Sequence, residues 1–223
     1  MSSTFIDILI RPDAFFRNVL QEKESLKLPV LIVAAGSIVA AAYGYLIGGL
    51  TAKMMAPAMP AGIDTIILLS SIIGAVIGTF IFWILWSGIS YALTHLFKGK
   101  GSFKRTLEVF GYGYLPQVFG SLISLVVALE YLPKITIPQI TSATLQDPAL
   151  LEQAMKAFTH DPAMMELTQI TSLITIVFLL WSANIWIFGI QHARQVSSRD
   201  AAICVGIPVV IYVIYVIYTI GAM

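Results

Sequence analysis

The sequence predicts an all-α fold: a polytopic membrane protein with a bundle of five transmembrane helices and short amphipathic helices at the membrane interface. Of its 223 residues, 58% are hydrophobic and only 11% are charged, whereas soluble domains carry about 25% charged residues. Five runs of the chain are almost free of charge, and each has the roughly 20 residues that a helix needs to cross the hydrocarbon core. Lys and Arg are also spread unevenly among the loops, as in membrane proteins of fixed orientation.

The first element is an N-terminal segment, residues 1–27, which is expected to be cytoplasmic and to contain an amphipathic helix. Pro12 marks a helix start, and Phe15 and Phe16 fall on one arc at helical spacing, opposite Arg17. The favoured interpretation is a small cap packed under the bundle. The alternative is a helix lying in the membrane interface.

The membrane domain, residues 28–223, follows directly. Its five spans are expected at about 28–52, 65–97, 103–129, 164–191 and 201–223. The second run is longer than a span requires, so that helix is expected to tilt or to project from the membrane.

The cationic residues predict the orientation. Ten Lys and Arg residues fall on the side of the N-terminus and three on the other side, which places the N-terminus in the cytoplasm and the C-terminus outside. Met223 is then expected at the outer face.

The long loop before the fourth span contains two similar helix starts. Asp147-Pro148 and Asp161-Pro162 each combine an N-cap residue with a proline at the first helical position. The first is expected to begin a short helix, and the second to begin the lead-in to the fourth span.

Small residues predict where the spans pack closely. Gly44 and Gly48 in the first span, and Gly74 and Gly78 in the second, have four-residue spacing and are expected to form a contact between these two helices. In the third span, helix packing is assigned to Gly113, Pro116 and Gly120. Pro116 is also expected to kink that helix.

Polar residues form one seam in the third span and another in the fourth. The first seam includes Gln117, Ser121 and Ser124, and the second includes Thr171 and Thr175. We favour mutual packing, with hydroxyl groups bonded to their own backbone. A hydrated path that also uses Asn184 is the alternative.

Glu108 is the acidic residue inside the uncharged runs, and such residues suggest function by default. Ser102 is the expected N-cap of the third span, about two turns earlier. Lys104 and Arg105 lie four and three residues before Glu108, within reach on a helix. A structural carboxylate is therefore favoured, with a pH-sensitive contact to His95 as a further hypothesis.

The sequence lacks the patterns that carry catalysis or metal binding. It has no H-E-x-x-H and no G-x-S-x-G motif, and its three histidines are scattered. We therefore expect no catalytic residues, no cofactor, no metal and no enzymatic activity. The net charge of +1 gives no indication of nucleic-acid binding.

Three short motifs resemble those of a known family. They are Pro12 with Phe15 and Phe16, the Gly-Ser-Phe of residues 101–103, and GYGYLP at residues 111–116. In their order and spacing the chain resembles the Yip-domain family, the Ypt-interacting proteins. The resemblance implies a five-helix membrane domain with a cytoplasmic N-terminus. Eukaryotic members are associated with Rab-type GTPases and with vesicle transport between ER and Golgi.

The short N-terminal segment is similar to that of the compact bacterial and archaeal members, so a prokaryotic cell membrane is expected rather than a eukaryotic endomembrane. The leading functional hypothesis is a non-enzymatic scaffold or adaptor in membrane organisation or trafficking. The alternative is a small transporter or channel with a polar path along the third and fourth spans. Expected partners are membrane lipids, with a protein partner or a homo-oligomer as further possibilities.

Overall fold

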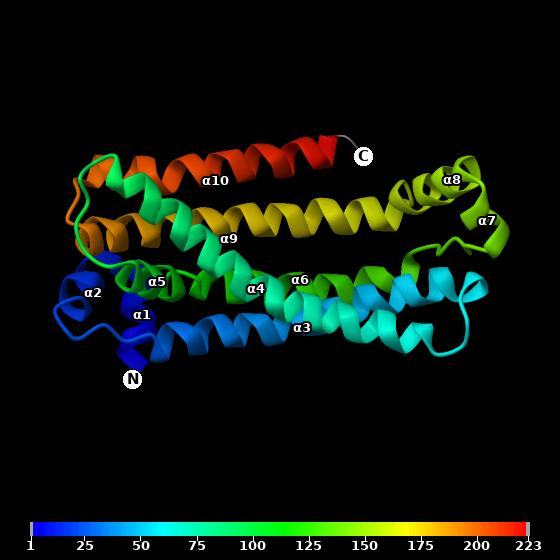
Figure 1. Ribbon diagram of the computed structural model, residues 1–223, viewed down its shortest axis with the longest axis horizontal. Coiled ribbons are helices and arrows are strands. Elements are labelled where there is room, and N and C mark those ends of the chain that lie inside the picture. The colour runs from blue at the N-terminus through cyan, green and yellow to red at the C-terminus, as the bar shows by residue number, and fades with distance from the viewer. Residues whose placement is uncertain (1, 222–223) are drawn as a thin grey trace.

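The computed structural model describes residues 2–221 (Figure 1), so Met223 and its expected position lie outside the described residues. Within them the chain is helical and has no strand. The elements are α1 Ser2–Ile10, α2 Pro12–Val19, α3 Lys27–Met55, η1 Ala56–Ala58, α4 Ile63–His95, α5 Phe103–Tyr112, α6 Leu115–Tyr131, η2 Leu132–Lys134, α7 Ser142–Gln146, α8 Pro148–Thr159, α9 Pro162–Arg194 and α10 Ser198–Gly221. The all-α fold is confirmed.

Five helices, α3, α4, α6, α9 and α10, are long and apolar enough to span a membrane. They form a ring in which α3 packs on α4 and α6, α9 packs on α6 and α10, and α10 packs on α4. Helix α4 closes the ring by crossing diagonally from α10 at one end to α3 at the other (Figure 1). The two neighbours of α4 therefore lie at opposite ends of its length.

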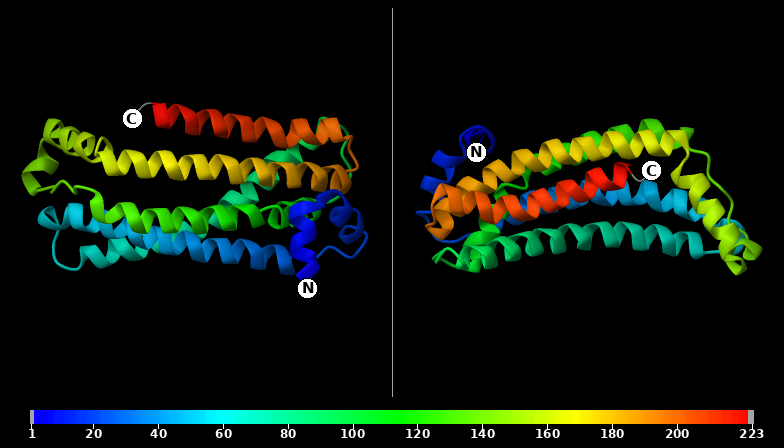
Figure 2. Two further views of the ribbon diagram at one scale, coloured as in Figure 1. Left: turned by 180° about the vertical axis from the view of Figure 1, so that it is seen from behind. Right: turned by 90° about the horizontal axis from the view of Figure 1, so that it is seen from above.

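The two ends of the bundle differ. One end, here called the capped end, carries α1, α2, α5 and the connections 96–102 and 195–197 (left in Figure 1). The opposite end carries η1, α7 and α8 (Figure 2). Each end has its own buried apolar cluster. The capped-end cluster is rich in aromatic residues, including Phe110 and Trp186, whose stacked rings lie 4.7 Å apart. The opposite-end cluster is centred on Leu50, Ala128, Ile135 and Leu167.

The expectation of one continuous third span from residue 103 to 129 is wrong. The chain forms two helices, α5 and α6, with Gly113 and Tyr114 between them. Pro116, at the second position of α6, cannot donate a hydrogen bond, and its ring collides with the carbonyl four residues earlier. That carbonyl belongs to Tyr112, where α5 ends. Helix α5 is outside the five spans and packs among α3, α4 and α9.

The N-terminal segment contains two helices rather than one. Helix α2 buries Pro12, Phe15 and Phe16 beneath the bundle, as the cap interpretation expected. Helix α1 was not expected. It crosses the capped end nearly perpendicular to the spans (Figure 2), and Trp181 of α9 donates a hydrogen bond to its Leu9 carbonyl at 3.3 Å.

Both Asp-Pro helix starts are confirmed. Asp147 caps α8 by accepting from Ala149 N at 2.9 Å. Asp161 caps α9 and also accepts from the Thr136 backbone N–H at 3.1 Å, which ties the loop to the helix. Burial raises the pKa of Asp161, but the backbone hydrogen bonds outweigh it and the pKa lies below its ordinary value.

Candidate functional site

Glu108 lies at the capped end, on α5, and its side chain is only 2% exposed. Its Oε2 forms an ion pair with Arg105 Nη1 at 2.7 Å, because residues three apart share a helix face. Burial raises the pKa of Glu108, although Arg105 and the Ser25 backbone N–H oppose that rise. Both Lys104 and Arg105 were expected within reach of Glu108, and Arg105 is the one that forms the ion pair.

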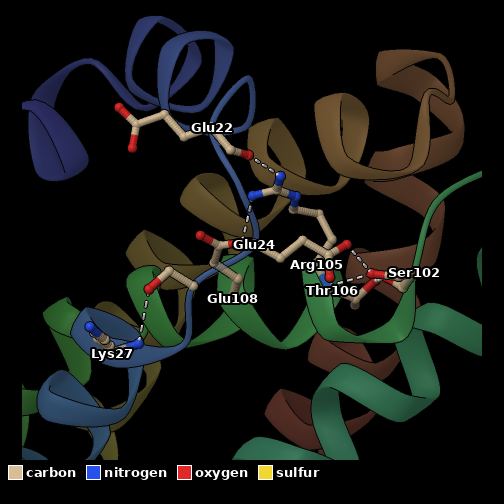
Figure 3. A network of polar contacts seen from close by, with 8 residues as sticks. Glu22, Glu24, Lys27, Ser102, Arg105, Thr106 and Glu108 are labelled. Carbon is tan, nitrogen blue, oxygen red and sulfur yellow. Dashed lines mark hydrogen bonds and ion pairs between the residues drawn. The ribbon is translucent and has the colours of Figure 1, made fainter.

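The same charged pair holds the linker between α2 and α3 (Figure 3). Arg105 Nη2 donates to the Glu22 carbonyl at 2.5 Å. Ser102, the confirmed N-cap of α5, accepts from Arg105 N at 3.0 Å and donates to the Glu24 carboxylate. The network thus joins segments about 80 residues apart in the sequence.

The hypothesis of a contact between Glu108 and His95 is wrong. His95 is exposed at the end of α4, and its ring packs edge-on against Tyr91 at 4.7 Å. Glu108 points toward Arg105 and the linker (Figure 3). None of the hydrogen bonds found in residues 2–221 joins the two side chains.

Arg194 is a buried cation that the sequence analysis counted only as a marker of orientation. It is fully buried and donates to Thr94 Oγ1 at 2.9 Å, to the Gly99 carbonyl at 3.0 Å and to the Gly101 carbonyl. Its guanidinium also lies over the Tyr91 ring at 4.3 Å. It therefore fixes the basic turn between α4 and α5 to the end of α9. No sequence signal separates Arg194 from the other loop cations, because its partners are two backbone carbonyls and two side chains about 100 positions away.

A second missed contact joins α2 to α9. His192 Nε2 lies 2.7 Å from Asp13 Oδ1. The hydrogen bond from His192 lowers the pKa of Asp13 below its ordinary value. The residues are 179 positions apart, so only the tertiary structure brings them together.

Away from the capped end, a cavity of about 550 Å³ lies among the spans. Its lining comes from α3, α4, α6 and α9. The cavity is lined by Val39, Ala40, Tyr43, Gly44, Ile47, Ser71, Ala75, Tyr114, Gln117, Gly120, Ser121, Ser124, Thr171 and Thr175. Polar residues of both expected seams line this cavity. The seams therefore face a common space, whereas the sequence analysis favoured direct packing of one against the other.

The polar groups of this wall differ in their hydrogen bonding. Thr171, Thr175 and Ser121 each donate to a carbonyl of their own helix, at 2.8, 2.8 and 2.9 Å. The Gln117 Nε2 atom is buried and has no partner among the described residues. Asn184 is exposed on the outside of α9 and does not line the cavity, so the alternative that placed it on a common polar path is wrong for this residue.

The glycines divide into packed and unpacked positions. A Cβ on Gly44 or Gly48 would lie 2.7 Å from Ser71 of α4, and one on Gly120 would lie 2.8 Å from the Phe178 ring. The expected partners Gly74 and Gly78 have nothing within 4 Å. Their assignment to packing within this chain is wrong, because Ser71 and its turn face α3 instead.

Gly113 and Gly78 illustrate the contrast between packed and unpacked positions. A Cβ on Gly113 would lie 2.3 Å from the Trp186 ring, so Gly113→Ala is expected to lower the free energy of unfolding by about 2 kcal/mol. Gly78→Ala meets open space and is expected to raise it by up to about 1 kcal/mol, because alanine favours a helix. Equilibrium unfolding in mixed micelles would measure both. Equal effects of the two substitutions would contradict the packing contrast.

Within residues 2–221, no group of three or more His, Cys, Asp and Glu side chains is placed to hold a metal ion. The chain matches the Yip1 domain family over residues 6–220. It is 36% identical, over 126 residues, to an uncharacterized protein of Methanocaldococcus jannaschii, a match that covers 55% of this chain and 86% of that protein. No solved structure matches the chain.

Proposed function

Because the chain belongs to the Yip1 domain family, as a multi-pass membrane protein of that family, we propose that it is a non-enzymatic scaffold or adaptor in membrane organisation or trafficking. The observation that carries this proposal is that the loops of the capped end are held together. There the linker 20–26, the turn 96–102 and the end of α9 are joined into one surface by Arg105, Ser102 and Arg194. A surface whose loops are held in place suits the binding of a partner, since less conformational entropy is lost on binding.

The charge of this surface suggests the chemistry of the partner. Cations dominate its exposed side chains. The exposed cationic residues at this end are Arg11, Arg17, Lys23, Lys27, Lys98, Lys100, Lys104 and Arg199. An acidic protein surface would therefore be attracted to the capped end, while anionic lipid headgroups would compete for the same cations.

The adaptor proposal is tested by neutralising cations at one end at a time. A variant with Lys98, Lys100 and Lys104 changed to Gln is compared with a control in which Lys53, Lys134 and Lys156 are changed to Gln. After cross-linking in native membranes, we expect protein partners to be lost from the first variant and kept by the second. The same partners from both variants, or lipid alone from the wild type, would refute the proposal.

We further propose that the capped end faces the cytoplasm, since ten of the thirteen Lys and Arg residues lie on that side. With Cys204 changed to Ala, single cysteines are placed at the exposed positions Lys100 and Lys134. In intact cells, a membrane-impermeant maleimide is expected to label Lys134→Cys, and to label Lys100→Cys only after lysis. The reverse pattern would invert the orientation.

A small transporter is the second candidate, and the cavity with its unpaired Gln117 amide is the observation that favours it. Between the cavity and the capped end, however, lies the cluster of Trp83, Trp86, Phe110 and Trp186, which closes a path toward that end. Flux of a neutral solute into liposomes, abolished by Gln117→Leu and kept by Asn184→Leu, would favour the transporter over the adaptor. No flux in the wild type would exclude it.

A further inference from the structure

We propose that the cavity between α3, α4, α6 and α9 binds an electroneutral glycerolipid whose head has a carbonyl acceptor and a free hydroxyl donor, as diacylglycerol does. This inference goes beyond the adaptor role and does not depend on it. It comes from the position of the cavity, its charge, its hydrogen-bonding groups and its volume.

The position of the cavity makes a lipid the accessible ligand. The cavity lies between the capped-end and opposite-end clusters, among helices that span the membrane. Tyr43, Gln117, Ser124 and Thr171 in its wall are half-buried rather than fully buried, so the cavity opens outward. Helix α10 contributes no residue to the lining that the structure describes, and α4 crosses away from α10 toward α3 (Figure 1). At this depth the surroundings are acyl chains, and a ligand enters from them.

The absence of charge restricts the headgroup. Among the described residues that line the cavity, none is Asp, Glu, Lys, Arg or His. A phosphate or carboxylate in this position would be an unpaired ion in a medium of low dielectric constant, which is strongly unfavourable. The ligand is therefore uncharged.

The wall also specifies which polar groups the ligand carries. Gln117 Nε2 is a buried donor without a partner, and an unmade bond of this kind is costly until a ligand supplies an acceptor. The hydroxyl groups of Ser71, Ser121, Thr171 and Thr175 already donate their hydrogens to backbone carbonyls, so each presents only oxygen lone pairs to the cavity. A ligand that fits needs an acceptor for Gln117 and can place a donor on these oxygens, and the carbonyl and hydroxyl of a diacylglycerol head provide both.

The volume is consistent with this assignment. About 550 Å³ lies within the roughly 300–1,000 Å³ range of small-molecule pockets. It accommodates the glycerol head and the first part of the acyl chains, while the rest of the chains stay in the bilayer through the lateral opening.

The test uses the full-length protein in phosphatidylcholine nanodiscs with a diacylglycerol that carries a photoactivatable diazirine in one acyl chain. We expect labelling of α6 and α9 peptides that line the cavity. Unlabelled dioleoylglycerol should compete, whereas dioleoyl phosphatidic acid and the methyl ether of dioleoylglycerol should compete at least about tenfold less well, because one adds charge and the other removes the donor.

Three variants locate the binding. Gln117→Leu removes the unpaired donor and should weaken labelling about tenfold. Ala40→Phe fills the cavity while it keeps Gln117, and it should abolish labelling. Asn184→Leu removes an exposed amide outside the cavity and should leave labelling unchanged.

Specific outcomes would overturn the proposal. These are equal competition by phosphatidic acid, labelling that maps away from the cavity, or cavity residues cross-linked to a second copy of the chain instead of the lipid. If Gln117→Leu does not give a monodisperse protein, Ala40→Phe and the competition on wild-type protein decide the question. Loss of protein partners in the adaptor experiment would not affect these measurements.

Discussion

Replacing Glu108 with Ala is expected to lower the free energy of unfolding by about 3 kcal/mol, because Arg105 and the Ser25 backbone N–H lose their hydrogen-bond acceptor, which a protonated Glu108 would still provide. Arg105 is only 13% exposed and pairs with Glu108 at 2.7 Å. Breaking a buried ion pair by removing one member costs about 3–5 kcal/mol, and the residual exposure of Arg105 places the effect at the lower end. Equilibrium unfolding in mixed micelles of dodecyl maltoside and SDS would measure it.

The matched control is Glu130→Ala, which removes an exposed carboxylate that pairs with Lys134 at 3.2 Å. That change is expected to cost about 0–0.5 kcal/mol. The double variant Glu108→Leu/Arg105→Leu removes both charges and should recover part of the loss. If Glu108→Ala and Glu130→Ala had equal effects on stability, the structural role of Glu108 would be refuted.

The pH dependence of Glu108 is opposite to that of an exposed carboxylate in an ion pair. Burial raises its pKa in the folded chain, so the folded state binds this proton more tightly than the unfolded state does. The resulting stabilisation is fully present below the unfolded pKa and is lost as the pH rises through the folded pKa. Relative to Glu108→Gln, which cannot titrate, the wild type should therefore gain stability as the pH is lowered from 7 toward the ordinary value of 4.5. A constant difference would contradict this assignment.

Arg194→Met is also expected to have a large effect and to lower the free energy of unfolding by about 3 kcal/mol. The change removes the donor for Thr94 Oγ1 and for the carbonyls of Gly99 and Gly101. A buried acceptor left without a donor costs about 1–3 kcal/mol; Thr94 is fully buried, whereas the contacts to Gly99 and Gly101 are partly buried and add less. The turn between α4 and α5 would lose its attachment to α9, and limited proteolysis should then cut this turn faster than in the wild type.

Two further variants test whether Arg194 stabilises the turn through its several hydrogen bonds or only through its positive charge. Arg194→Lys keeps the charge but loses the planar fork that reaches several acceptors, so an intermediate loss is expected. Arg199→Met removes an exposed cation five residues later and should change stability by less than about 0.5 kcal/mol. If Arg194→Met resembled Arg199→Met in both stability and proteolysis, the anchoring role would be refuted.

The sequence predicted the Glu108–Arg105 pair because the two residues are three apart on one helix, where local geometry is enough. It predicted both Asp-Pro helix starts for the same reason, since a cap and its N–H donors lie within three residues. It did not predict the contact between Asp13 and His192, or the anchoring by Arg194. These depend on residues 179 and about 100 positions apart, and no local pattern marks such a pair.

The break at Gly113-Tyr114 shows where local reasoning was incomplete. Pro116 was expected to kink one helix, and a neighbouring helix or water can satisfy the carbonyl that a proline leaves free. Here the chain ends α5 and begins α6 instead, and Trp186 occupies the space beside Gly113. Whether a proline bends or ends a helix is thus decided by what packs against it.

By itself, the sequence determined the all-α class, the number of spans and the approximate limits of four of them, because these follow from the cost of exposing charge and unpaired backbone groups to hydrocarbon. Only the tertiary structure decided which residues of each span face one another. Most of the surface of the spans is apolar, and lipid solvates leucine as well as a helix neighbour does, so hydrophobicity alone does not mark the inner face. That is why Gly74 and Gly78 were assigned to a helix contact, why Asn184 was considered for an interior path, and why the cavity around Gln117 emerged only from the folded chain.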